Sequence, residues 1–428
     1  MPVNLNMLNI DLHSHSGYSG GVGQVSLESI VYGMKLKGID IFGTGDCLHR
    51  KWQKLLSNEL SQIAEGIFIS KFSDKHYFIL QTEVIFTIPY AKGKRKLFHI
   101  VMTFPDFLSV KKTADYIESI GVSNNIGRPF IKFYSLKDVN IFMEAIKSIN
   151  ENIEFIPAHV MTPQGIFGSI NPLYSLNDMF GEAKKLISIV ETGLSSDPQM
   201  LSLIPELDNI NFISNSDCHS PGLNRIGREY TQVKCDLLDY NNIMKCLKDK
   251  EKTFTYEFPP QEGKFFLTGH RKGKVGHEHS ECVFSPDFTP ESKICPVCKK
   301  KLTIGVYEQL LDIVKVHKAE DRLILNPYER KNYKWLVPLT DVILFAKGNK
   351  TFSKKISEKA YEIINFYGSE RALWKNFNVE NHRKENERLL WSIEQVKNGN
   401  FSFFPGYDGE YGKLVVGKEL NFLDINIC

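Results

Sequence analysis

The stretch NIDLHSHSGYSG, residues 9–20, places two histidines directly after a short apolar run and before a glycine-rich loop. Side chains alternate along an extended strand, so His13 and His15 point to the same side. Two histidines in this arrangement suit a metal ion, but two isolated loop histidines are more often ordinary residues. The choice between a metal site and two ordinary loop histidines therefore depends on the rest of the sequence.

Further apolar runs follow along the first 225 residues, and most are about four to eight residues long, the length typical of strands buried on both faces. Helical segments alternate with them, such as 136–149 and 26–38, where Ser26 can cap the helix and Gly38 can end it. This alternation predicts a mostly parallel α/β sheet or barrel. The runs are IDIFGTGD (39–46), YFILQTEV (77–84), LFHIVMTF (97–104), EFIPAHV (154–160), SIVETGL (188–194) and NFISNSDCH (211–219).

Side chains that bind metals stand in or at the ends of these runs. In a β/α barrel the carboxyl ends of the strands meet on one face, so we expect these side chains to gather there. Imidazole and carboxylate ligands suit zinc, manganese or iron, and two such ions can activate water and stabilise a phosphate ester during hydrolysis. The candidates are His13, His15, Asp46, Glu83, His99, His159, Glu191, Asp217 and His219.

The composition is that of a globular protein. Hydrophobic residues make up 42% of the 428 residues and charged residues 24%. The sequence has no apolar run of about eighteen residues and no secretory signal at its start, which predicts a cytoplasmic protein without a membrane partner. The net charge of +3 is too small to indicate nucleic-acid binding by itself.

The character of the sequence changes near residue 259, where Pro, Gly, Lys and Cys become frequent. His279-x-x-Cys282 is followed, after twelve residues, by Cys295-x-x-Cys298. This spacing predicts a closed structural zinc site, in which His277 could replace His279. We therefore predict a metal-binding barrel over 1–258, a zinc-binding module over 259–305 and a mainly helical domain over 306–428.

Basic and aromatic residues around this module are candidates for DNA binding. Lysines and arginines can contact phosphates, and exposed tyrosines can stack on a base turned out of the duplex. A second basic cluster, 92–96, is expected at a hairpin tip. The candidates in and near the module are Arg271, Lys272, Lys274, Lys299 and Lys300, with Tyr407 and Tyr411 in the turn region GYDGEYG (406–412).

The motifs HSH, GTGDCLH, QTE, PAHV and SDCH, in this order and spacing, resemble the polymerase-and-histidinol-phosphatase (PHP) superfamily. That resemblance implies a distorted β/α barrel that hydrolyses phosphate esters with up to three metal ions. Within the superfamily, the chain is similar to endonuclease Q, a family of DNA-repair nucleases. The similarity extends from about residue 9 to 415 and rests on MKLKGIDIFGTGD, NIGRP, ETGLSSDP, SNSDCHSP, GRE, EGK, GHRK, CPVC, LTIGV and PGYDGEYG.

The resemblance implies roles for the candidate ligands. His13, His15, Glu83 and Asp217 would hold one divalent ion, and Glu83 would bridge to a second ion held with His99 and His159. Asp46, His49 and His219 would serve a third ion, although GYSGGVGQV lacks the additional ligand that many PHP proteins carry there. Asp217, His219 and Glu83 are the expected catalytic residues, two to three ions (Zn, Mn, Mg or Fe) the expected cofactors, and Glu191 a supporting residue.

The activity that the resemblance implies is metal-dependent cleavage of DNA on the 5′ side of deaminated bases, such as uracil, hypoxanthine or xanthine, or of abasic sites. Two alternatives stay open at this point: a small-molecule phosphatase, and a DNA-binding or sensor subunit of a helicase or phage-defence system. DNA, as a damaged duplex or a single strand, is the expected partner, and a helicase or replication clamp is a further candidate.

Overall fold

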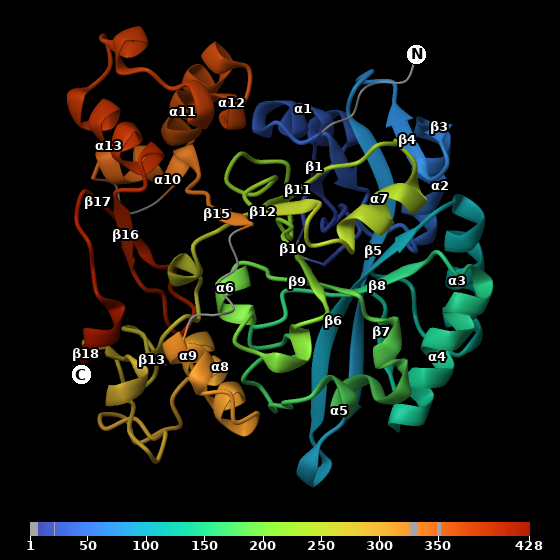
Figure 1. The fold of residues 1–428 in the computed structure, drawn as a ribbon, viewed down its shortest axis with the longest axis horizontal. Helices are drawn as coiled ribbons and strands as arrows, with labels where there is room; N and C mark the ends of the chain where they lie inside the picture. Colours follow the sequence, from blue (N-terminus) through green and yellow to red (C-terminus); the bar gives the residue numbers. More distant parts are fainter. Residues whose placement is uncertain (1–6, 21, 326–331, 349–351) are drawn as a thin grey trace.

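The computed structural model describes residues 7–20, 22–325, 332–348 and 352–428. Figure 1 shows a sheet-rich region formed by the first part of the chain, beside a helical group formed by the last part. A small gold-coloured region with little regular structure lies below the helical group. This arrangement confirms the predicted α/β class.

The central sheet is mixed. Strands β1, β2 and β5 pair in parallel, whereas β5–β6, β6–β8, β1–β11 and β11–β12 are antiparallel. The expectation of a mostly parallel sheet was therefore wrong, chiefly because β5 and β6 form one long hairpin. The eleven strands are β1 (Leu8–Asp11), β2 (Ile41–Gly43), β3 (Leu60–Ala64), β4 (Ile67–Ser70), β5 (Tyr77–Pro89), β6 (Arg95–Phe104), β7 (Phe130–Lys132), β8 (Glu154–Pro157), β11 (Tyr230–Val233), β12 (Thr253–Glu257) and β15 (Tyr333–Trp335).

A second, parallel pair, β9 (Ile189–Glu191) and β10 (Asn211–Ile213), lies between β8 and β1. The amide of Val160 donates to Glu191 O after β8, and the amide of Leu12 donates to the Asn215 side chain. These contacts, and not a continuous strand pairing, connect β8 with β9 and β10 with β1. The ring of strands is therefore closed irregularly, which gives the barrel its distorted form. Every residue of β1, β2, β8, β9 and β10 is buried, as the apolar runs predicted.

The helices begin and end where the capping residues indicate. Ser26 accepts a hydrogen bond from the amide of Ser29 at the start of α1, and Gly38 ends this helix with φ 82°. The predicted helix 136–149 corresponds to α4. The α-helices are α1 (Leu27–Lys37), α2 (Arg50–Glu59), α3 (Phe107–Ser119), α4 (Leu136–Ile149), α5 (Leu176–Phe180), α6 (Pro198–Leu201), α7 (Tyr240–Leu247), α8 (Val306–Val316), α9 (Asp321–Leu325), α10 (Leu339–Ala346), α11 (Lys354–Tyr367), α12 (Glu370–Asn376) and α13 (Glu387–Lys397).

The later part of the chain packs in two places. Helices α10 to α13 and the hairpin of β16 (Phe401–Phe404) and β17 (Lys413–Val416) surround a second core, which also contains Leu36 of α1 and Leu223. Helix α8 instead joins the larger core, which also contains Phe266 and Val283. The gold region carries β13 (Thr268–His270) and β14 (Cys282–Phe284), and the last strand of the chain, β18 (Asn426–Ile427), pairs with β14. The three-part division at 258 and 305 stays a prediction.

Among the described residues, no helix combines the length and the apolar character needed to cross a membrane.

Candidate metal centre and nucleic-acid interface

Glu83, in the middle of β5, lies at the centre of a buried histidine cluster. Its Oε1 lies 2.6 Å from His99 Nδ1, 3.3 Å from His159 Nε2 and 3.4 Å from His13 Nε2. Its Oε2 lies 3.5 Å from His15 Nε2. One carboxylate therefore faces histidines on both sides, which is the arrangement that a bridging ligand needs.

Two groups share this carboxylate. His13, His15 and Glu83 form the first, and Asp217 Oδ1 lies 3.6 Å from His13 Nε2 and 3.2 Å from His15 Nε2. Glu83, His99 and His159 form the second. Donor atoms bound to one tetrahedral zinc ion lie about 3.3 Å apart, so most of these separations fit a common ion. The geometry thus brings together the two ligand sets that the sequence predicts.

The third predicted ligand set differs from the structure. His219 lies with His15 and Asp217, and its Nδ1 is 3.5 Å from Asp217 Oδ1. Among the described residues, the groups that could hold an ion include neither Asp46 nor His49. Asp46 accepts hydrogen bonds from the amide and hydroxyl of Ser16, and His49 stacks on Tyr18 with ring centroids 4.4 Å apart.

Hydrogen bonds fix which nitrogen of His13 and of His15 faces the cluster. Nδ1 of His13 faces the Glu191 carboxylate at 3.0 Å, and Nδ1 of His15 faces Asp46 at 3.3 Å. A carboxylate accepts, so both Nδ1 atoms donate and each Nε2 keeps its lone pair for the cluster. Glu191 also accepts from the amide of His159 and from Asn215. Glu191 is thus hydrogen-bonded to His13 and His159, two of the predicted ligands.

Backbone strain is concentrated at this site. Asp46, His159 and Asp217 all have positive φ, at 43°, 30° and 46°. Non-glycine residues rarely adopt such angles, and they persist where surrounding contacts hold them. At His159 the side chain of Thr162 supplies part of that hold, because its hydroxyl donates to His159 O.

The carboxylates dominate the electrostatics of the cluster. Burial lowers the pKa of His13, but Glu191 and Asp217 outweigh burial and leave it well above its ordinary value. Burial likewise opposes the shift of His15, whose pKa is nevertheless raised to about 9 by Asp217, Asp46 and Glu83. Burial raises the pKa of Glu83, yet the neighbouring histidines hold it well below the usual range. The site therefore attracts positive charge.

Unsatisfied polar atoms test whether metal ions fit here. His13 Nε2, His15 Nε2, Glu83 Oε2 and Asp217 Oδ1 are all buried and have no hydrogen-bond partner within the described part of the chain. Such atoms are costly unless something binds them. Two nitrogen lone pairs and two carboxylate oxygens that meet at one point are a suitable donor set for zinc, manganese or iron.

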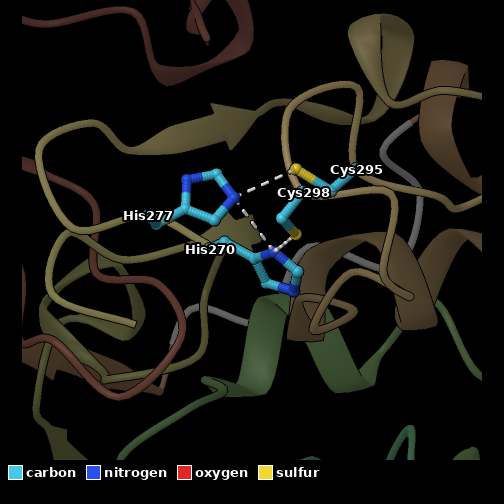
Figure 2. A group of neighbouring side chains, drawn as sticks. All are labelled: His270, His277, Cys295 and Cys298. Atoms are coloured by element: carbon cyan, nitrogen blue, oxygen red, sulfur yellow. Dashed lines mark hydrogen bonds between the residues drawn. The ribbon is translucent and has the colours of Figure 1, made fainter. Parts of the chain in front are cut away.

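A second cluster of metal-binding side chains lies in the small module, where Figure 2 shows two histidines and two cysteines turned toward one another. His277 Nε2 lies 3.1 Å from Cys295 Sγ, and His270 Nδ1 lies 3.3 Å from Cys298 Sγ. The two histidines are 3.4 Å apart through His270 Nδ1 and His277 Nε2. Four donors at these separations suit one tetrahedral zinc ion.

This cluster corrects two members of the predicted zinc set. His279 is exposed and lies outside the group, whereas His277 is buried within it. Cys282 forms a disulfide with Cys428, because β18 pairs with β14 and brings the two residues together. The Cys282 sulfur still lies 3.9 Å from Cys295 Sγ, at the edge of the cluster.

The basic residues predicted to bind DNA differ in their exposure and in their ion pairs. Lys272, Lys299 and Lys300 are exposed. Lys274 is paired with Asp408 at 2.7 Å, and Arg271 with Glu410 at 3.2 Å.

The hairpin tip predicted for 92–96 is confirmed between β5 and β6, but only part of the cluster is exposed. Lys92 and Lys94 are exposed. Lys96 is buried and donates to Gly168 O and Ile170 O. It serves the fold and not a phosphate.

A cavity of about 310 Å³ lies beside the turn region 406–412. Tyr407 is only 7% exposed, and its hydroxyl donates to Glu281. Tyr411 is 40% exposed, with Lys264 Nζ 4.6 Å from its ring centroid and Arg225 Nη1 3.4 Å from its hydroxyl. The cavity is lined by Lys272, Glu281, Phe404, Pro405, Tyr407, Glu410, Tyr411 and Lys413.

Sequence reasoning missed several of these residues. His270 stands in the quoted motif GHRK, directly after an apolar run, which is the signal that identified the barrel ligands. Arg128 stands in NIGRP, and its Nη1 lies 3.6 Å from Glu83 Oε2. Lys264 stands in the quoted motif EGK, whereas Arg225 carries no motif or spacing signal. Only the fold brings the two residues to Tyr411.

No family model matches the chain. Among curated proteins, it is 29% identical over 245 residues to the uncharacterized protein MJ0043 of Methanocaldococcus jannaschii, covering 56% of this chain and 30% of that protein. The chain thus spans less than a third of that relative. It is 24% identical over 435 residues to the uncharacterized protein YqxK of Bacillus subtilis, covering 94% of this chain and 98% of that protein.

Two solved structures are similar over nearly the whole chain. The lesion-specific endonuclease PfuEndoQ from Pyrococcus furiosus has a TM-score of 0.77 at 26% identity, covering 96% of this chain and 95% of that one. Endonuclease Q in complex with a 27-mer duplex substrate with an abasic lesion at the active site has a TM-score of 0.79 at 26% identity, with 98% of each chain covered. These matches confirm the predicted likeness to endonuclease Q.

Proposed function

We propose that this chain is a metal-dependent DNA endonuclease that acts in DNA repair. It would hydrolyse the phosphodiester bond on the 5′ side of deaminated bases (uracil, hypoxanthine, xanthine) or of abasic sites. The observation that carries the proposal is Glu83, one buried carboxylate shared by two histidine groups. The likeness to an endonuclease Q structure solved with an abasic-lesion duplex supports DNA as the substrate.

In this proposal His13, His15, Glu83 and Asp217 hold one ion, and Glu83, His99 and His159 hold a second. A third ion would use His15, Asp217 and His219 in place of the set with Asp46 and His49. When bound, divalent ions supply water activation and charge stabilisation for phosphodiester hydrolysis.

The protein's own residues orient this chemistry. Glu191 and Asp46 hold the tautomers of His13 and His15 through their Nδ1 atoms. His219 is the most accessible of the three catalytic candidates, with 38% of its side chain exposed. Its Nδ1 donates to Asp217 O at 3.0 Å, so Nε2 carries the lone pair that can bind an ion or accept a proton. Burial lowers the pKa of His219, which keeps this nitrogen unprotonated.

The cavity beside Tyr411 is the proposed contact for the damaged nucleotide. A damaged base pairs poorly, so turning it out of the duplex costs less than the few kcal/mol required for a normal pair. Tyr411 is exposed enough to stack on a base, whereas Tyr407 is buried and occupied by Glu281. Lys272 on the rim, with Lys299 and Lys300 on the same module, would contact phosphates.

We also propose that His270, His277, Cys295 and Cys298 bind a structural zinc ion. All four donors are protein side chains, which leaves no position for a substrate. The ion would fix the module that carries Lys272 next to the cavity. The cytoplasmic location and a helicase or replication-clamp partner stay predictions.

A cleavage assay tests the main proposal. The protein is incubated with Mn²⁺, Mg²⁺ or Zn²⁺ and with duplexes that carry uracil, hypoxanthine, an abasic site or no lesion. We expect cleavage of the damaged duplexes only, and loss of cleavage in Asp217→Ala with DNA binding retained. Faster turnover of a chromogenic phosphate monoester than of any duplex would instead favour a small-molecule phosphatase.

A further inference from the structure

Arg128 is held at the edge of the metal centre by a loop with several fixed points. The amide of Gly127 donates to Tyr18 O at 3.0 Å, and the amide of Ile85 donates to Pro129 O at 2.9 Å. A Cβ atom on Gly127 would lie 2.4 Å from the Asp46 carboxyl carbon, so only glycine fits there. These contacts hold Arg128, which stands between Gly127 and Pro129, next to β5 and the histidine cluster around Glu83.

The guanidinium of Arg128 reaches the carboxylate that the two histidine groups share. Its Nη1 lies 3.6 Å from Glu83 Oε2, beyond hydrogen-bond distance. Its Nε is buried without a hydrogen-bond partner among the described residues. The side chain is 24% exposed, so part of it also faces solvent.

Arg95, on the neighbouring strand β6, provides a contrast. Its guanidinium donates to Thr87 Oγ1 and Thr87 O, and also to Phe133 O. The guanidinium of Arg95 is therefore already hydrogen-bonded within the protein. Arg128 keeps donor capacity at the metal centre, and a guanidinium offers five N–H donors in a planar fork that suits the oxygens of a phosphate.

The guanidinium of Arg128 lies beside the bridging carboxylate and opposes the binding of metal ions there, because its positive charge repels theirs at this distance. The same charge is favourable when an anion binds at the same place. A phosphate that meets both the cluster and Arg128 would satisfy the buried Nε and compensate the added positive charge.

From this geometry we propose that Arg128 binds a non-bridging oxygen of the phosphate being hydrolysed. The inference rests on the proposed phosphoesterase function and adds a substrate-binding residue to it. Arg128 would stabilise the charge that develops on the phosphate, and a group of this kind contributes about 10²–10³-fold to the rate.

The first test is binding, so that it does not depend on nuclease activity. Inorganic phosphate is titrated calorimetrically into the metal-loaded protein and into the variants Arg128→Gln and Arg128→Lys. We expect at least about tenfold weaker phosphate binding by Arg128→Gln, a smaller loss in Arg128→Lys, and unchanged metal content by elemental analysis. Arg383→Gln, an exposed arginine paired with Glu380, is the matched control and should bind phosphate normally.

The second test uses cleavage of a lesion duplex under single-turnover conditions. Arg128→Ala should lower the rate constant about 10²–10³-fold, change the DNA dissociation constant little, and recover part of its rate when guanidinium ion is added. Normal phosphate binding by Arg128→Gln would overturn the proposal. A loss of metal from that variant would also overturn it, because Arg128 would then only support Glu83. If the wild-type protein binds phosphate but cleaves no DNA, the nuclease assignment fails and the phosphate site stands.

Discussion

Replacing Glu83 by Gln tests the bridging role at the centre of the site. The change keeps the size of the side chain and removes one negative charge. Four histidine nitrogens lie within 3.5 Å of the carboxylate oxygens, belonging to His13, His15, His99 and His159. A neutral amide can face one histidine group with its oxygen, but its NH₂ group then faces the other. Each proposed ion therefore loses an anionic ligand, and one of them loses its ligand atom altogether.

We expect this variant to bind at least one ion fewer than the wild type. The stabilisation supplied by a catalytic metal is several kcal/mol, so a loss of about 4 kcal/mol corresponds to about a thousandfold slower cleavage. Elemental analysis after dialysis measures the ions, and single-turnover cleavage of a lesion duplex measures the rate. Glu144→Gln, an exposed glutamate on α4, is the control. Full metal content and a normal rate in the Glu83 variant would refute the bridging role.

Three further outcomes are expected. Metal affinity should rise with pH up to about 9, because His15 has a pKa of about 9 in the metal-free site and only its neutral form binds an ion. Metal binding should therefore release protons, which calorimetry in buffers of different ionisation enthalpy would detect. A pH-independent affinity would count against the site. His277→Ala should lose the structural zinc and His279→Ala should keep it, as measured by zinc content. Tyr411→Ala should weaken lesion discrimination more than Tyr407→Phe, and equal effects in a binding assay would argue against stacking on Tyr411.

Much of the barrel site was predictable because local pattern and strand geometry agree. Apolar runs that end in histidine or carboxylate predicted side chains just after strand ends, and His13, His15, His159 and Asp217 follow β1, β8 and β10 in this way. The long β5–β6 hairpin was harder to predict from the sequence, because two consecutive apolar runs do not show whether the strands are parallel or antiparallel. Glu83 and His99 lie inside that hairpin and meet across it.

Other features depend on contacts that local spacing does not encode. Asp46 looks like a ligand from its position after β2, yet Ser16 and His15 occupy its oxygens. His279 has the regular spacing to Cys282, but the backbone turn puts His277 next to Cys295 instead. Arg128 lies in a loop without periodicity, and only tertiary packing brings it to Glu83.

The most direct test of the central claim is the cleavage position on a duplex with a single uracil. The 5′-labelled strand is incubated with metal-loaded protein beside an undamaged duplex of the same sequence, and the products are separated at single-nucleotide resolution. We predict one product that ends immediately 5′ of the uracil, with no product from the undamaged duplex and none from Asp217→Asn. Equal cutting of both duplexes, or no cutting with any of the divalent ions, would contradict the proposal of a lesion-specific endonuclease.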